Sequence, residues 1–307
     1  MKGSWRRWPT GREACALLGL LLAVSFCLQW QQLPATVSAE GRVLSAEGAE
    51  TERTKADDPT AWAATIGPLT PHADPLRTMI RTDPAAFFRG ALERYERSSH
   101  DYVCTFSKQE RIEGRLKPEE VMQVRFRQKP FSVDMLWVKG EDRARRAIYV
   151  EGKWTGKHGE KLAMVEPAGW LARLLVGHVM RPIDGSDARQ AARHPIDHFG
   201  FANSMRLILE GSRPSDQHAE YVLRYTGQGE IDGRPTYVVE RRPLIADETG
   251  VYEDQLLVVH VDQEYLLPTC CTMYADEART KLTEQYLVTN ITFNVGLTDH
   301  DFTLSSD

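Results

Sequence analysis

Cysteine is scarce in this chain, and its scarcity limits the redox and metal chemistry that the chain can carry. The sequence has 307 residues and five cysteines, with no Cys-x-x-Cys spacing among them. Three of them follow the N-terminal region: Cys104, Cys270 and Cys271. Because neighbouring strand residues point to opposite faces, Cys104 can pair with Cys270 or with Cys271 but not with both. Buried thiols on strands are commoner than a metal or redox pair, and we expect that role here.

Catalytic motifs are also missing. The chain has neither the Gly-x-x-x-x-Gly-Lys-Ser/Thr loop that holds phosphates nor the Gly-x-Ser-x-Gly turn of a serine nucleophile. The nearest approach to a metal site is His194-x-x-x-His198 with Asp197, since two histidines four apart share one helical face and suit zinc. Pro195 marks a helix start, however, which places His194 at the cap, and the Glu of His-Glu-x-x-His is absent. We therefore expect no metal, no cofactor and no catalytic residue.

The apolar run near the N-terminus is too short for a bilayer-spanning helix. Ala14–Leu28 has 15 residues, whereas a spanning helix needs ~20. The run follows a basic leader and precedes the small residues Val37-Ser38-Ala39, which is the order of a secretory signal peptide. We predict that residues 1–39 are cleaved on export and that the mature protein has no stable membrane span. An uncleaved membrane anchor is the alternative.

Basic residues are not in excess. Cleavage after residue 39 removes four basic groups and one acid, so the net charge moves from −5 to −8. Nucleic acid is therefore not expected as a partner, because phosphate binding needs a basic surface. Residues 40–74 hold few large apolar side chains and are expected to form a disordered tether. A single domain is expected at 75–303, with a tail at 304–307.

Alternating apolar and polar residues dominate the part of the chain from 101 to 150. Four segments of strand length occur there, and the middle two, 121–127 and 131–138, place the following large apolar residues at every second position: Met122, Val124, Phe126, Phe131, Val133, Met135 and Trp137. Side chains alternate across a strand, so this pattern predicts an antiparallel sheet with one apolar face. Phe106, Phe126, Met135 and Trp137 are expected to share that face.

The remaining elements complete an α+β pattern. Asp83 and Pro84 predict a helix start, followed by apolar residues at helical spacing over roughly 14 residues. A second helix is expected from about His194 to Gly211, and strands return from Glu220, for nine to eleven strands in all. The segment 162–181 is apolar and only loosely periodic, and we expect it to be a flap or a short helix that caps a cavity.

The order of these pieces resembles DUF1571, a domain of unknown function found in planctomycetes and related bacteria. The resemblance covers about residues 80–303 and is carried by Tyr102-Val-Cys-Thr-Phe-Ser-Lys-Gln-Glu-Arg, Phe126-Arg-Gln-Lys-Pro-Phe-Ser-Val, Tyr149-Val-Glu-Gly, His194-Pro-Ile and Asn294-Val-Gly-Leu-Thr-Asp-His-Asp-Phe.

More distantly the chain is similar to the LolA/LppX-type periplasmic carriers. The matching places are Phe106 to Gln109, Pro130-Phe131, Gly233-Arg-Pro-Thr-Tyr237 and Leu267-Pro268. This similarity implies an unclosed antiparallel β-barrel, a LolA-like half-barrel, with helices covering its concave face. Such a hollow holds acyl chains or receives a lipidated peptide.

These observations favour an exported, non-enzymatic carrier or binding module of the bacterial cell envelope. Its expected partner is a hydrophobic small molecule, a lipid or the acyl chains of a lipoprotein, since ligand pockets are mostly apolar. The candidate cavity-lining residues are Phe106, Val124, Phe126, Val133, Met135, Trp137, Trp170 and Leu174. The alternative is an envelope interaction or sensor protein that binds a partner protein or peptide through the same sheet.

Overall fold

The computed structural model of the chain describes residues 75–141, 143–210, 221–243 and 256–304. The expected signal peptide at 1–39 and tether at 40–74 lie outside the described residues. Of the expected tail, Leu304 is described, and it packs against a small apolar cluster that contains Phe302. The extent of the expected single domain stays a prediction.

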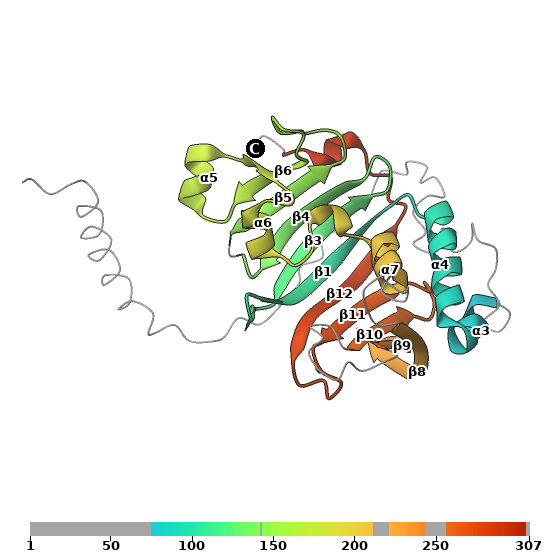
Figure 1. Cartoon of the computed structure of the whole chain (residues 1–307). Coiled ribbons are helices and arrows are strands. Elements are labelled where there is room, and N and C mark those ends of the chain that lie inside the picture. Colours follow the sequence, from blue (N-terminus) through green and yellow to red (C-terminus); the bar gives the residue numbers. More distant parts are fainter. Residues whose placement is uncertain (1–74, 142, 211–220, 244–255, 305–307) are drawn as a thin grey trace, which may run out of the picture. The chain divides into compact units, whose positions relative to one another are not determined.

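Twelve strands form one antiparallel sheet (Figure 1). They are β1 Asp101–Ile112, β2 Arg115–Leu116, β3 Glu120–Arg127, β4 Ser132–Lys139, β5 Ala144–Val150, β6 Leu162–Pro167, β7 Val179–Pro182, β8 Tyr221–Ile231, β9 Arg234–Pro243, β10 Leu256–Asp262, β11 Pro268–Tyr274 and β12 Leu282–Phe293. Nine to eleven strands were expected from the sequence. The strands β2 and β7 are too short to show the alternation of apolar and polar residues by which a strand is predicted.

The order of the strands makes the sheet an open one. It runs β7-β6-β5-β4-β3-β1-β12-β11-β10-β9-β8, with β2 paired to β1 beside this row. Within the described ranges the edge strands β7 and β8 do not pair with each other. The expected unclosed antiparallel β-barrel is therefore confirmed. Its two halves meet where β1 pairs with β12.

Strand register brings the apolar residues of three strands together. The aligned rows across β1, β3 and β4 are Tyr102–Phe126–Val133, Cys104–Val124–Met135 and Phe106–Met122–Trp137. The expectation that Phe106, Phe126, Met135 and Trp137 share one face is confirmed. We call this face of the sheet the inner face. A one-residue slip would turn the whole set outward, so burial of the inner face fixes the register.

Five α-helices and two 3-10 helices are described: α3 Pro75–Thr82, α4 Pro84–Ser98, α5 Trp170–Val176, α6 Ser186–Ala191, η1 Ile196–His198, α7 Phe201–Glu210 and η2 Asp299–Phe302. The expected start of α4 is confirmed, because the Ala86 amide donates to Asp83 Oδ1 at 2.9 Å and Pro84 is the first helical residue. Instead of one helix from about His194, the chain forms η1 and then α7, which are separated by Gly200.

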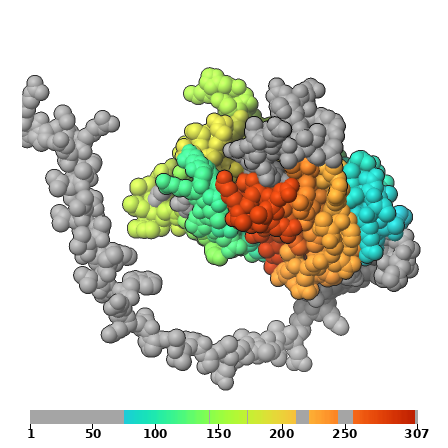
Figure 2. All heavy atoms as spheres, turned by 60° about the horizontal axis from the view of Figure 1, so that its bottom comes forward, coloured from blue at the N-terminus to red at the C-terminus, as the bar shows by residue number. Residues whose placement is uncertain are grey.

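Helices α4 and α7 bury one part of the inner face. Tyr95 of α4 and Tyr102 of β1 both contact the ring of Phe201 in α7, with ring centroids 5.8 and 5.2 Å apart. Phe87 and Phe88 of α4 belong to the same buried cluster. Helices α3 and α4 lie beside β8 at one end of the sheet (Figures 1 and 2). The packed core is therefore at the α4 and α7 part of the inner face.

The segment 162–181, expected to be a flap or a short capping helix, contains the short helix α5 but forms no flap over the sheet. Its two ends are the strands β6 and β7, which pair with each other and extend the sheet beyond β5. Strand pairing satisfies their backbone hydrogen bonds, which a loose flap would leave to water. Helix α5 connects the two strands and is largely exposed, with Trp170 at 71% and Leu174 at 74% of full exposure.

Gly200 provides a test of how tightly the start of α7 packs. Its φ is +104°, and a Cβ there would lie 2.9 Å from Cε2 of Phe126. Gly152, in the turn after β5, also has a positive φ of +73° but nothing within 4 Å of the added Cβ. We expect Gly152→Ala to lower the free energy of unfolding by about 1 kcal/mol through backbone strain. Gly200→Ala is expected to cost at least ~2 kcal/mol, because a clash is added to the strain.

Urea denaturation of both variants checks this expectation, with the change taken from the midpoints at constant slope. Equal losses in the two variants would mean that Phe126 and Gly200 do not pack as described.

Candidate ligand cavity

A cavity of about 1360 Å³ lies between the inner face of the sheet and the segment 183–210. Ligand pockets for drug-sized molecules have roughly 300–1,000 Å³, so this one has room for a larger guest. Strands β1, β3 to β7 and β9 to β12 contribute to its wall, which includes the apolar residues Phe106, Met122, Met135, Trp137, Phe199 and Val288. The cavity thus lies over the part of the inner face that is not filled by the packing of α4 and α7.

The eight candidate residues fall into three groups. Phe106, Met135 and Trp137 line the cavity. Val124, Phe126 and Val133 lie in the packed core, at 2%, 3% and 0% exposure. Trp170 and Leu174 are on α5 and are not part of the cavity wall. Contact of any of the eight with a ligand stays a prediction.

The inner face of β1 changes from apolar to charged along its length. Tyr102, Cys104 and Phe106 are followed at the same spacing by Lys108 and Glu110, which are 8% and 4% exposed. In the register of β1 and β12, Glu110 stands directly opposite Glu284, which is 8% exposed. Two like charges facing each other across strands are destabilising, so this pair needs compensation from neighbouring groups.

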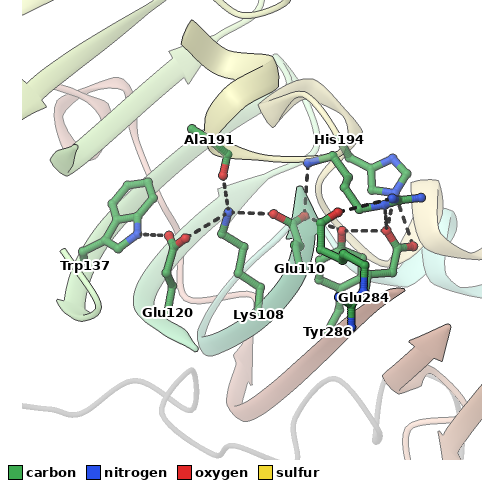
Figure 3. Close-up of polar contacts among 10 residues, drawn as sticks. Lys108, Glu110, Glu120, Trp137, Ala191, His194, Glu284 and Tyr286 are labelled. Carbon is green, nitrogen blue, oxygen red and sulfur yellow. Dashed lines mark hydrogen bonds and ion pairs between the residues drawn. The ribbon is translucent and has the colours of Figure 1, made fainter. Parts of the chain in front are cut away.

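Groups on the sheet supply the first part of that compensation (Figure 3). Lys108 Nζ donates to Glu110 Oε2 at 3.1 Å and forms an ion pair with Glu120 Oε1 at 3.6 Å. The Tyr286 hydroxyl donates to Glu110 Oε1 at 2.5 Å and lies 3.2 Å from Glu284 Oε2. Trp137 Nε1 donates to Glu120 Oε2 at 2.6 Å, which links the cluster to an apolar residue of the cavity wall.

The segment opposite the sheet supplies the second part. Arg193 donates through Nε to Glu284 Oε2 at 2.8 Å and through its amide to Glu110 Oε1 at 3.3 Å. His194 Nε2 lies 3.4 Å from Glu284 Oε1. The expected role of His194 as a helix cap is therefore wrong, because its ring turns to Glu284 on the sheet (Figure 3). We call Lys108, Glu110, Glu120, Arg193, His194, Glu284 and Tyr286 the charged cluster.

Charge within the cluster balances when His194 is protonated, with three carboxylates facing three cations. The hydrogen bond to Glu284 raises the pKa of His194, against the effect of burial. Burial alone would raise the pKa of Glu284, but His194 and Arg193 outweigh it and hold the pKa below its ordinary value. Burial, together with the charges of Glu284 and Glu110, raises the pKa of Tyr286, so its hydroxyl stays protonated and available as a donor.

The histidine and cysteine side chains of the described residues are arranged as follows. Among the described residues no three or more His, Cys, Asp or Glu side chains are grouped so as to hold a metal ion. The rings of His194 and His198 lie 6.5 Å apart, centroid to centroid. Cys104, Cys270 and Cys271 are free thiols, and burial raises the pKa of Cys104, which keeps it a poor nucleophile.

No helix within the described ranges has the length and apolar character to cross a membrane.

The family model for DUF1571, described as a protein of unknown function, matches residues 99–307. This chain belongs to the DUF1571 family. The matched range starts just before β1 and includes every strand of the sheet, so the resemblance expected from the sequence is confirmed. No curated protein matches the chain.

Solved structures similar to this DUF1571 chain include MucB, at 16% identity and a TM-score of 0.41, where 73% of this chain covers 63% of MucB. The MucA/MucB complex of Pseudomonas aeruginosa is similar at 14% identity and a TM-score of 0.40, over 72% of this chain and 60% of the other. The lipoprotein LppX of Mycobacterium tuberculosis is similar at 11% identity and a TM-score of 0.32, over 70% of this chain and 100% of LppX.

The expected distant likeness to the LolA/LppX group is thus found. The chain spans less than two thirds of MucB, and at these identities and TM-scores none of the three structures shows what the DUF1571 chain binds.

The charged cluster is the feature that reasoning from the sequence missed. One signal was present: Lys108 and Glu110 continue the every-second-residue spacing of Phe106, and Glu284 and Tyr286 share one spacing on β12. Continued alternation predicts that these charges face inward. Nothing in the sequence pairs them with Arg193 and His194, which come from a segment without periodicity.

Removal of the Tyr286 hydroxyl tests whether it keeps Glu110 and Glu284 together. We expect Tyr286→Phe to lower the free energy of unfolding by ~1–3 kcal/mol, because the buried carboxylate of Glu110 loses its closest hydrogen-bond donor. Tyr274→Phe on β11 is the control, since its hydroxyl makes no hydrogen bond within the described part of the chain. Urea denaturation at neutral pH measures both, and a loss no larger for Tyr286→Phe than for Tyr274→Phe would contradict this role.

Proposed function

We propose that this DUF1571 protein is an exported, non-enzymatic binding module that carries a lipid, the acyl chains of a lipoprotein or another hydrophobic ligand in the bacterial cell envelope. The observation that supports this proposal best is the cavity of about 1360 Å³ on the inner face of the sheet.

The wall of the cavity suits an apolar guest. Large apolar side chains of the sheet, such as Met135 and Trp137, face Phe199 and Ile208 across it. Removal of about 300 Å² of apolar ligand surface from water would contribute roughly 7 kcal/mol at 25 cal/mol per Å², before the costs of association are subtracted. That is sufficient for a ligand held without covalent bonds.

The charged cluster makes one side of the cavity polar. Its carboxylates are paired with Lys108, Arg193 and His194, so the wall offers hydrogen-bonding groups with little net charge. A ligand with an acyl chain and a small polar end would match both sides. Because each carboxylate is already paired, the wall holds no uncompensated buried charge when no ligand is bound.

Export and the absence of catalysis are parts of the proposal that rest on the sequence. The order of basic, apolar and small residues before Glu40 supports export, and no nucleophile or cofactor motif is present in the sequence.

A second candidate function, an envelope protein that binds a partner protein, is favoured by α5. Five large apolar residues of this helix are more than half exposed: Trp170, Leu171, Leu174, Leu175 and Val176. Exposed apolar groups gathered in one place are typical of interaction sites. In this second function the cavity need not hold a ligand.

Filling the cavity tests the leading proposal. Ala147 lies in the cavity wall on β5, between Met135 and Val165 on the neighbouring strands. We expect Ala147→Trp to weaken binding of fluorophore-labelled palmitate by about tenfold or more, because the indole occupies space that the acyl chain needs. Val138→Trp is the control, since Val138 is on β4 but is 56% exposed.

Fluorescence titration measures the affinities, and native mass spectrometry with lipid extraction of the purified mature protein identifies what it carries. A wild-type protein that binds no labelled palmitate and releases no lipid on extraction would contradict the carrier function.

Substitution on α5 separates the two candidate functions. Since α5 is outside the cavity wall, we expect Trp170→Asp and Leu174→Asp to leave the affinity for labelled palmitate within about twofold of wild type. The same titration checks this, with far-UV circular dichroism as the control for folding. A loss of binding in both folded variants would mean that α5 belongs to the ligand site.

A further inference from the structure

Residues 184–199 cover the cavity, and of these residues Ile196 and Phe199 pack, partly buried, against the apolar clusters of the sheet. The residues at either end, Ile183 and Gly200, are buried, whereas none of the residues between them is fully buried. The short helices α6 and η1 within this segment likewise contain no buried residue. We call residues 184–199 the cover. Segments with few buried apolar contacts open at low free energy, so the cover belongs to the least stable part of the fold.

Most contacts of the cover with the sheet are weak. The ion pairs Lys161–Asp197 and Arg181–Asp187 have distances of 2.8 and 3.6 Å and involve lysine and arginine side chains that are 60% and 55% exposed. Exposed ion pairs contribute little because water screens them. Phe199 makes the main aromatic contact, with its ring 5.1 Å from that of Phe106 and 6.0 Å from that of Phe126.

The charged cluster is the stronger attachment, and it holds the middle of the cover. Lys108 Nζ donates to the carbonyl oxygen of Ala191 at 3.3 Å, in addition to the contacts of Arg193 and His194 with Glu110 and Glu284. The two carboxylate residues that hold Arg193 and His194, Glu110 and Glu284, are 4% and 8% exposed. Hydrogen bonds to buried charged groups are about twice as strong as neutral ones, so these contacts resist opening more than the surface pairs do.

Glycines stand near both ends of the cover. Gly185 precedes α6, and Gly200, with a φ that other residues rarely adopt, follows Phe199. Hinges are a few residues at the ends of elements that absorb changes in backbone angles. The cover therefore has a glycine near each end, where the backbone angles can change, and between the two glycines it is attached to the sheet by the charged cluster.

We propose that the cover is the gate of the cavity and that Arg193 and His194, held by Glu284 and Glu110, are its latch. This inference rests on the proposed function, in which a ligand enters and leaves the cavity. Release of the latch frees residues 191–194 from β1 and β12 and exposes the cavity to solvent or to a membrane.

The latch responds to pH because two of its members titrate. On the sheet, His194 faces Glu284 and Tyr286 of β12 and Glu110 of β1. Within the cover, it lies beside Arg193 and His198. The pKa of His194 is raised above its ordinary value of 6.5, so its ion pair is complete below pH 6.5 and is lost as the pH rises through the raised value. The pKa of Glu284 is lowered from 4.5, so its charge is lost only as the pH falls below the lowered value.

The latch is therefore complete between about pH 4.5 and 6.5, and it weakens on either side. Arg193 stays charged throughout, so the weakening above this window is partial. Opening of the cover is expected to become more frequent as the pH rises from 6 to 8.

Hydrogen–deuterium exchange of the ligand-free, full mature protein tests the latch without any ligand. In Arg193→Gln and in His194→Gln we expect the amides of the cover to exchange roughly tenfold faster than in wild type, after correction for intrinsic rates. Arg189→Gln is the matched control, because Arg189 is also in the cover but donates to Asp184 within it. In His194→Gln the increase in exchange between pH 6 and pH 8 should disappear.

Uptake of labelled palmitate is measured in parallel by stopped-flow fluorescence. Faster uptake in the two latch variants, with no change in Arg189→Gln, supports the gate. Exchange of the cover that is equal in all four proteins, or a pH dependence that persists in His194→Gln, overturns the latch even if palmitate binds. Faster exchange without any palmitate binding leaves the latch standing and counts against the carrier function.

Circular dichroism and urea denaturation show whether each variant is folded, and a variant that is not folded is replaced by Arg193→Lys or His194→Asn.

Discussion

Glu110 and Glu284 face each other across the junction of β1 and β12, with both carboxylates almost fully removed from water. This junction joins the two halves of the sheet, so the fold depends on the neutralisation of a pair that would otherwise separate the strands. The groups that compensate this pair are Lys108 beside them, the Tyr286 hydroxyl between them as a hydrogen-bond donor, and Arg193 and His194 from the cover. Removal of any one of these groups leaves a buried carboxylate with one partner fewer. The resulting loss of stability is larger than the net stability that the intact contact contributes.

The same interaction determines where the cavity ends and how it is covered. Between Ile183 and Gly200 the side chains of the cover are at most partly buried, so the carboxylates that hold Arg193 and His194 add to the apolar contacts of Ile196 and Phe199 in fixing its position. Stability of the sheet junction and closure of the cavity are thus two effects of one group of contacts. A family that shared this arrangement could not change the junction without also changing the cover.

Reasoning from the sequence identified what depends on local periodicity. The alternation of Met122, Val124 and Phe126 predicted the inner face, and Asp83 with Pro84 predicted the start of α4. It could not divide the inner face into core and cavity, because Phe126 and Trp137 have the same pattern and differ only in what packs on them. Phe126 is enclosed by Gly200 and the ring of Phe199, whereas Trp137 borders the cavity. The strands at the two ends of the segment 162–181 were not expected, because the pairing of β6 with β5 depends on residues that lie elsewhere in the sequence. The partners of His194 were out of reach for the same reason, since Glu284 is on the last strand.

The pairing of the first long strand with the last has a consequence for how the chain folds. Synthesis runs from the N-terminus, so β1 is complete long before β12 exists, and the strands β3 to β11 are all made in between. During that time one edge of β1 stays without its partner, while its hydrogen-bonding groups and the side chains of Phe106 and Glu110 remain in contact with water. Closing so long a loop is slow, and unpaired strand edges are the sites at which chains associate wrongly. The buried carboxylates put a charge on that edge until β12 arrives, and a charged edge resists pairing with other chains.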